Sequence, residues 1–155
     1  MPAIKVTPTK GLHQVSGTTT VPSGTLTGQF YCVVAQSAAT TLVAADSGKV
    51  FELDADSGYT ITLPTAGSSV KGWHARFVLT DAGSNDVKIT TATANGIQGH
   101  VADPSTGANA IDHHLVKFVA STAIVGDYID LYCNGTRYIV SGYSGATDGL
   151  AGAAS

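Results

Sequence analysis

Residues 128–140 read YIDLYCNGTRYIV, and this stretch decides the fold. In its first half, apolar side chains at positions 129, 131 and 133 alternate with polar or aromatic ones. This is the period-two pattern of a strand with one buried face and one wet face. A second apolar run follows, and between the two runs stands Asn134-Gly135, a strong signal for a tight hairpin turn, here expected as type I′. The stretch therefore predicts two antiparallel strands.

The same period recurs along the chain, and turn signals separate its occurrences. Alternating runs stand at residues 59–63, 73–80, 87–90 and 116–120. Pro64 ends one of these runs, because proline cannot donate to a strand ladder. Roughly nine or ten short strands at such spacing indicate an all-β chain, a single antiparallel β-sandwich or barrel that is jelly-roll-like. The phase of the pattern places Trp73, Phe77 and Phe118 in the core.

The composition favours the same fold class. Thr, Ser and Gly number 20, 13 and 18 of the 155 residues, and there is a single Glu. Charged residues make up 12% of the chain, against roughly 25% in an average soluble protein. This mix favours strands and turns over helices. A hydrophobic content of 43% supplies enough apolar side chains for a packed core, which excludes a disordered chain.

Charge and small-residue content divide the chain into three parts. Residues 1–27 hold Lys5 and Lys10, no acid, three prolines and no long apolar run. They are expected to form an extended N-terminal arm. The β domain is expected over residues 28–143. The last segment, residues 144–155, consists almost entirely of small residues and is expected to be a flexible tail, loose or laid on a neighbour.

Several classes of function and location are excluded by simple features. The net charge is −3, so the dense basic footprint of a nucleic-acid-binding protein is missing. No run of 18 apolar residues is present to span a membrane, and the first residues carry no apolar secretory signal. Cys32 and Cys133 lie in apolar runs far apart in sequence. Two buried free thiols are the favoured interpretation, and a disulfide stays open.

The residue types that catalyse reactions or bind metals are not arranged for either task. His113 and His114 are adjacent, so on a strand they point to opposite faces, and the other three histidines are scattered. The motif Asp54-Ala55-Asp56-Ser57-Gly58 resembles the opening of a calcium loop but lacks the later acidic ligand, so a polar turn is the better interpretation. No nucleophile elbow, activated cysteine or assignable carboxylate pair is present. We therefore expect no enzyme activity, no cofactor and no metal.

Four aromatic residues are candidates for a binding surface. Trp73, Tyr128, Tyr132 and Tyr143 could form a sugar-binding platform, but Trp73 is in phase with the core residues of its strand. Tyr128 and Tyr132 are out of phase with the core of theirs. Exposed tyrosines on a sheet often mark a protein interface. Tyr128 and Tyr132 are therefore candidate residues of a subunit or partner interface.

Five segments, taken in order, resemble small virion proteins of tailed bacteriophages. These segments are residues 40–53, 58–64, 72–80, 95–99 and 126–142. Such proteins are typically capsid decoration (cement) proteins or modules of fibres and spikes. The resemblance implies an all-β domain, no enzyme activity and a homo-oligomer on the virion, often a trimer.

The function expected from these features is that of a capsid decoration protein. It would bind the outer capsid surface and stabilise the shell by bridging neighbouring subunits. The major capsid protein and further copies of the chain would be its partners. It would be made in the host cytoplasm and reside on the capsid surface of the virion. Lys5, Lys10 and His13 of the arm could meet an acidic surface on the shell or on a neighbouring copy. Two alternatives remain: a fibre or spike module that binds a host glycan or protein, and a cupin-like metal protein.

Overall fold

A computed structural model describes residues 4–7, 11–14, 32–92, 96–105 and 107–153. The chain divides into two compact units, Met1–Phe30 and Tyr31–Ser155.

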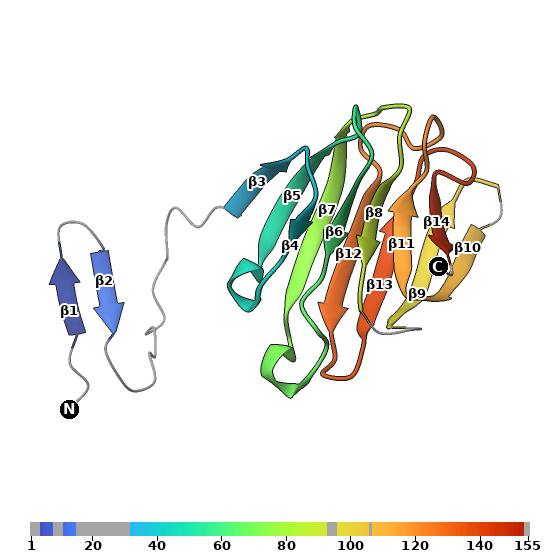
Figure 1. The fold of residues 1–155 in the computed structure, drawn as a ribbon. Coiled ribbons are helices and arrows are strands. Elements are labelled where there is room, and N and C mark those ends of the chain that lie inside the picture. Colours follow the sequence, from blue (N-terminus) through green and yellow to red (C-terminus); the bar gives the residue numbers. More distant parts are fainter. Residues whose placement is uncertain (1–3, 8–10, 15–31, 93–95, 106, 154–155) are drawn as a thin grey trace. The chain divides into compact units, whose positions relative to one another are not determined.

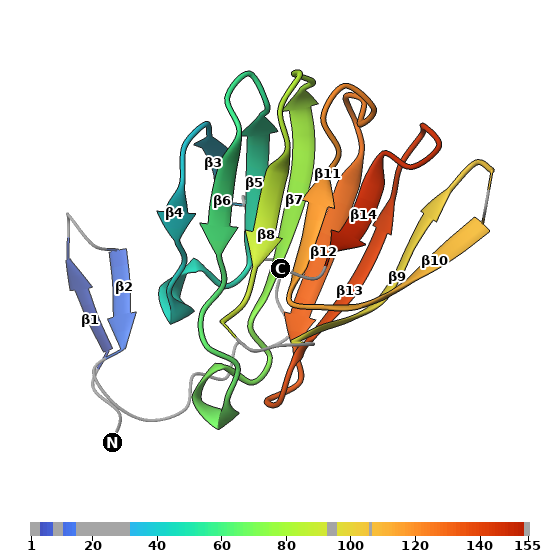
Figure 2. The ribbon, with the colours of Figure 1, turned by 45° about the vertical axis from the view of Figure 1, so that its right-hand side comes forward.

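The larger unit is a β-sandwich of a seven-stranded and a five-stranded sheet, which form two layers that face each other (Figures 1 and 2). The seven-stranded sheet has the order β10 (Gly107–His113), β9 (Ile97–Asp103), β13 (Tyr138–Tyr143), β12 (Tyr128–Cys133), β7 (His74–Asp81), β5 (Lys49–Asp54) and β3 (Cys32–Gln36). The five-stranded sheet has the order β14 (Leu150–Ala153), β11 (Leu115–Phe118), β8 (Val87–Thr90), β6 (Tyr59–Thr62) and β4 (Thr40–Thr41). Two single-turn 3-10 helices, η1 (Ala44–Asp46) and η2 (Ser68–Val70), lie in connections. The expected β-sandwich is thus confirmed.

The sheets are mixed, which corrects the expectation of purely antiparallel pairing. From β3 to β8, consecutive strands alternate between the two sheets. The neighbours β3, β5 and β7 therefore run parallel in one sheet, and β4, β6 and β8 run parallel in the other. The second half of the chain contributes the antiparallel hairpins β9–β10 and β12–β13. A period of two reports which face of a strand is buried but not the direction of its neighbour, so the sequence pattern carries no signal for this alternation.

The core lies between the two sheets and matches the phase read from the sequence. Phe77 is fully buried, and its ring stacks on that of Phe51 with centroids 5.1 Å apart. Trp73 meets Tyr138 edge to face at 5.7 Å. Phe118 contributes to the core from the five-stranded sheet. The predicted core positions of Trp73, Phe77 and Phe118 are confirmed.

The turn between β12 and β13 is tight, as expected, but it is not of type I′. Positive φ is confined to Gly135 (97°), the first central residue, as in a type II′ turn. The Asn134 carboxamide oxygen accepts hydrogen bonds from the backbone N–H groups of Thr136 and Arg137, both at 2.9 Å. Asn134 precedes the two central residues of the turn, so its backbone does not need a positive φ.

We expect Gly135→Val to lower the free energy of unfolding by about 1–3 kcal/mol, the usual cost of forcing a branched side chain into positive φ. Urea unfolding at pH 7 measures the change. Thr136→Val changes an exposed neighbouring residue without positive φ, serves as the control and should change stability by less than about 1 kcal/mol. Equal stability of the two variants would contradict the positive φ at Gly135.

The expectation of a flexible tail at residues 144–155 is wrong for the four residues that form a strand. Leu150–Ala153 forms β14, which pairs with β11 from Phe118↔Leu150 to Leu115↔Ala153. Leu150 is buried in the core. The small residues reflect close packing and not looseness: a Cβ on Gly149 would collide with the Ser144 hydroxyl, and one on Gly152 with the ring of His113.

The N-terminal unit also differs from the expected arm. The boundary between the units lies after residue 30 and not after residue 27. Within this unit β1 (Ile4–Thr7) and β2 (Gly11–Gln14) pair as an antiparallel hairpin, with Ile4 opposite Gln14. Residues 4–7 do alternate between apolar and polar side chains, but the prolines at positions 2 and 8 favoured an extended arm over a strand. An isolated two-stranded hairpin has marginal stability in water.

Candidate functional site

The outward face of the seven-stranded sheet presents an ordered array of side chains. Strands β7, β12 and β13 lie side by side, and their registers align outward residues into three rows across the sheet. The rows are His74, Tyr132 and Ile139; Arg76, Asp130 and Ser141; and Val78, Tyr128 and Tyr143. Alternation along each strand keeps these side chains out of the core.

Arg76 is the best-anchored side chain of the array. Its Nε donates to Asp130 Oδ1 at 2.7 Å and its terminal nitrogen to Oδ2 at 2.5 Å, so the pair is bidentate. The guanidinium carbon also lies 4.8 Å from the centroid of the Tyr128 ring. The Arg76 and Asp130 side chains are 50% and 35% exposed, and such pairs add at most about 1 kcal/mol to stability. The contact therefore mainly fixes the orientation of the two groups.

A hollow of about 680 Å³ opens on this face. Tyr132 lines it and is half exposed. The charged and polar side chains that line the same hollow include Lys49, His74, Arg76, Asp130 and Ser141. This volume falls within the range of roughly 300–1,000 Å³ typical of small-molecule sites.

A second ion pair stands beside this hollow. Lys49 Nζ lies 2.6 Å from Asp46 Oδ1. The hydrogen bond between them lowers the pKa of Asp46 below its usual value and raises the pKa of Lys49 above its own. Both groups therefore stay charged near neutral pH, and their charges compensate each other.

The structure separates the aromatic residues that the sequence singled out. Tyr128 and Tyr132 lie on the outward face, as their phase predicts, and Tyr143 lies on the same face and is 46% exposed. Trp73 is buried, with its indole N–H donating to the carbonyl of Val43 at 3.1 Å. A platform of all four is therefore wrong, and three tyrosines share the face. Their role at an interface stays a prediction.

The predicted arm residues lie in the N-terminal unit. Lys5 of β1 stands opposite His13 of β2 in the hairpin register, and Lys10 lies outside the described residues. Sequence reasoning did not select Arg76, Asp130 and His74. The signal was present, because all three are out of phase with the core in their strands. Only the register of β7 against β12 shows that Arg76 stands opposite Asp130 and His74 opposite Tyr132.

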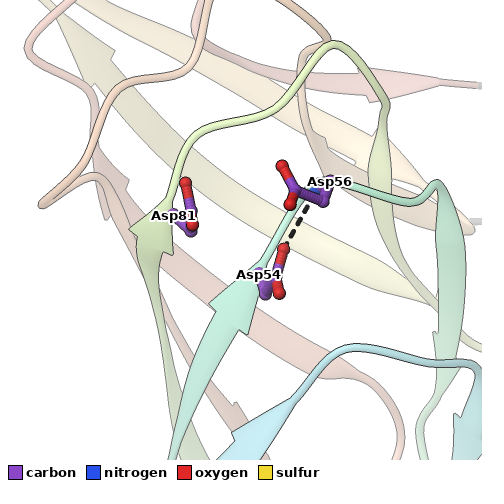
Figure 3. Close-up of side chains that lie close together, drawn as sticks. All are labelled: Asp54, Asp56 and Asp81. Carbon is purple, nitrogen blue, oxygen red and sulfur yellow. Dashed lines mark hydrogen bonds between the residues drawn. The ribbon is translucent and has the colours of Figure 1, made fainter.

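Three carboxylates lie close together at the carboxyl ends of β5 and β7 in the seven-stranded sheet. Figure 3 shows Asp54, at the end of β5, beside Asp56 and Asp81, and one oxygen of each lies within 4.8 Å of the others. Because β5 and β7 run parallel, their carboxyl ends meet and bring Asp81 to the motif that the sequence interpreted as a polar turn. Asp54 Oδ1 accepts the backbone N–H of Asp56 at 2.9 Å, as in an ordinary Asx turn. Asp56 and Asp81 are exposed, and we assign no ion to the group.

Histidines and cysteines form no such group within the described ranges. There the three aspartates are the only cluster of three or more potential ligands that come together. Cys133 is buried and free, as expected, but Cys32 is free and exposed, which corrects its predicted burial. The physical reason is that β3 is an edge strand, so one side of it is left uncovered.

Comparisons with protein-family models, curated proteins and solved structures return no match. Among the described residues, no helix has the length and apolar character needed to cross a membrane.

Proposed function

We propose that the chain is a non-enzymatic capsid decoration protein of a tailed bacteriophage. The observation that carries the proposal is where the segments resembling virion proteins fall in the sandwich. In chain order, the five segments cover β4 with most of β5, then β6, then most of β7, then the start of β9, and last the β12–β13 hairpin. The resemblance thus extends over four neighbouring strands of the seven-stranded sheet, β13, β12, β7 and β5, and over β6 and β4 of the other sheet, and it is not confined to a single hairpin.

The division into two units supports a bridging role. The N-terminal unit carries Lys5 and Lys10 and no acid, whereas Tyr31–Ser155 holds all 11 acids of the chain. A basic segment attached to an acidic body is suited to contact an acidic surface beyond that body. The proposed mechanism is mechanical: the sandwich covers one capsid subunit, and the N-terminal unit extends the contact to the shell or to a neighbouring copy.

Deletion of residues 1–20 is expected to weaken capsid attachment at least tenfold, about 1.4 kcal/mol. The melting temperature should stay within a few degrees, because the deletion leaves the whole of Tyr31–Ser155 intact. Attachment is measured by co-sedimentation with empty shells of the major capsid protein encoded in the same genome. Lys5→Gln with Lys10→Gln should remove the salt-dependent part of the attachment.

The matched control is Lys71→Gln with Lys88→Gln, which removes two exposed charges from the sandwich. It should leave attachment unchanged. Full occupancy by the truncated protein would contradict a role of the N-terminal unit, and no stoichiometric binding by the intact chain would overturn decoration itself.

Light scattering should give the mass of a homotrimer. A copy number of a handful per virion, in place of hundreds, would favour the fibre or spike alternative.

A further inference from the structure

The hollow on the outward face has three properties that together define a ligand class. The first is its aromatic wall. Tyr132 is 50% exposed although it sits in the middle of a sheet, between His74 and Ile139. An exposed tyrosine offers an apolar ring face for C–H groups and a hydroxyl that can donate or accept a hydrogen bond.

The second property is a set of polar groups held in fixed positions. The bidentate contact fixes the Arg76 and Asp130 planes relative to each other, and the Tyr128 ring supports the guanidinium from the side. Ser141 lies next to Asp130 in the same row. Groups that are oriented before a ligand arrives lose little entropy on binding, which favours recognition by hydrogen bonds.

The third property is charge balance. Each cation that lines the hollow has an anionic partner: Arg76 is paired with Asp130, and Lys49 with Asp46. A site for phosphate or a carboxylate would instead present uncompensated Arg or Lys. The balance favours a neutral ligand rich in hydroxyl groups.

We propose that this hollow binds a neutral saccharide, with a sugar ring stacked on Tyr132 and its hydroxyls bonded to Asp130, Ser141 and His74. The site is separate from capsid attachment through the N-terminal unit, so a decorated capsid would gain affinity for a glycan-bearing surface. The proposal does not depend on the capsid role.

The test is binding of the full chain to immobilised neutral oligosaccharides of glucose, galactose, mannose and N-acetylglucosamine, with a polyuronate as the acidic comparison. At least one neutral probe should bind with a Kd of about 1 mM or tighter. Tyr132→Ala should weaken binding at least tenfold, whereas Tyr132→Phe should stay within about threefold because the ring face is kept.

The matched control is Tyr143→Ala, because Tyr143 is 46% exposed on the same face but does not line the hollow. This variant should bind like the parent. Ser141→Trp introduces a large side chain at an exposed position that lines the hollow. It should block binding without changing any residue of the core. Asp130→Asn removes one negative charge beside Arg76 and should shift preference toward the polyuronate.

Three results would overturn the proposal. They are no neutral probe bound at millimolar concentration, equal losses for Tyr132→Ala and Tyr143→Ala, and preference of the parent for the polyuronate. A change of oligomeric mass in Tyr132→Ala, with no saccharide bound by the parent, would identify the face as a contact between copies instead. Capsid co-sedimentation of the same variants tests the decoration role separately and should be unaffected.

Discussion

Phe77→Ala is expected to lower the free energy of unfolding by about 3–5 kcal/mol, the range for truncating a fully buried aromatic side chain. Phe77 is 0% exposed in β7, near the middle of the seven-stranded sheet. Its ring stacks on Phe51 with an interplanar angle of 13°, and the register places Ile129 beside it on the other side. The cavity would therefore open where strands from both halves of the chain meet, and little can collapse into it.

The control is Val78→Ala, the next residue in the same strand, which faces outward and is only partly buried. It should cost less than about 1.5 kcal/mol. Phe118→Ala should behave like Phe77→Ala, since Phe118 is 1% exposed in the opposite sheet. Urea unfolding followed by circular dichroism measures all three. A cost for Phe77→Ala no larger than for Val78→Ala would mean that the burial phase of β7 is wrong.

The strands themselves were predictable, because a buried position shows in the sequence as an apolar residue at that position. Ile129, Leu131 and Cys133 alternate with wet positions in β12, and each is buried as its phase requires. The direction of pairing was not predictable, because β5 pairs with β7 only after the chain has crossed to the other sheet and back through β6. Nothing local distinguishes such a crossover from a hairpin.

The candidate site, too, was predictable only in part. The phase of β12 alone selects Tyr132 as an exposed aromatic residue. The contact of Arg76 with Asp130 joins residues that are 54 positions apart, so it depends on register and not on any motif. Sequence reasoning also treated the small residues after position 143 as a sign of looseness, whereas Gly149 is small because Ser144 lies where its side chain would be.

Asp127 explains why the C-terminal segment is fixed. This residue is only 2% exposed, and its carboxylate joins two connections of the sandwich. It accepts hydrogen bonds from the Ser144 hydroxyl at 2.7 Å, the Gly145 N–H at 2.8 Å and the Ile124 N–H at 3.0 Å. The carboxylate therefore ties the chain before β12 to the chain after β13, from which β14 starts.

We expect Asp127→Ala to destabilise the domain by roughly 3–5 kcal/mol. Each hydrogen bond to a charged group contributes about 1.5–3 kcal/mol, and bonds that share one acceptor do not add fully. The substitution also leaves the buried Ser144 hydroxyl without this acceptor. Asp127→Asn should cost about half as much, because the amide keeps one acceptor oxygen and turns the other position into a donor. Thermal and urea unfolding measure both variants.

Asp148→Asn is the matched control for the loss of one negative charge in the same region. Asp148 is exposed and has a φ of 59°, a conformation that asparagine tolerates. It should change stability by less than about 0.5 kcal/mol. Hydrogen exchange adds a local readout: Asp127→Ala should lose amide protection in β14 before β12, because β14 is an edge strand whereas β12 lies between β13 and β7. Unchanged protection of β14 would mean that its ladder with β11 is sufficient to hold it, and that the carboxylate orders only the connections.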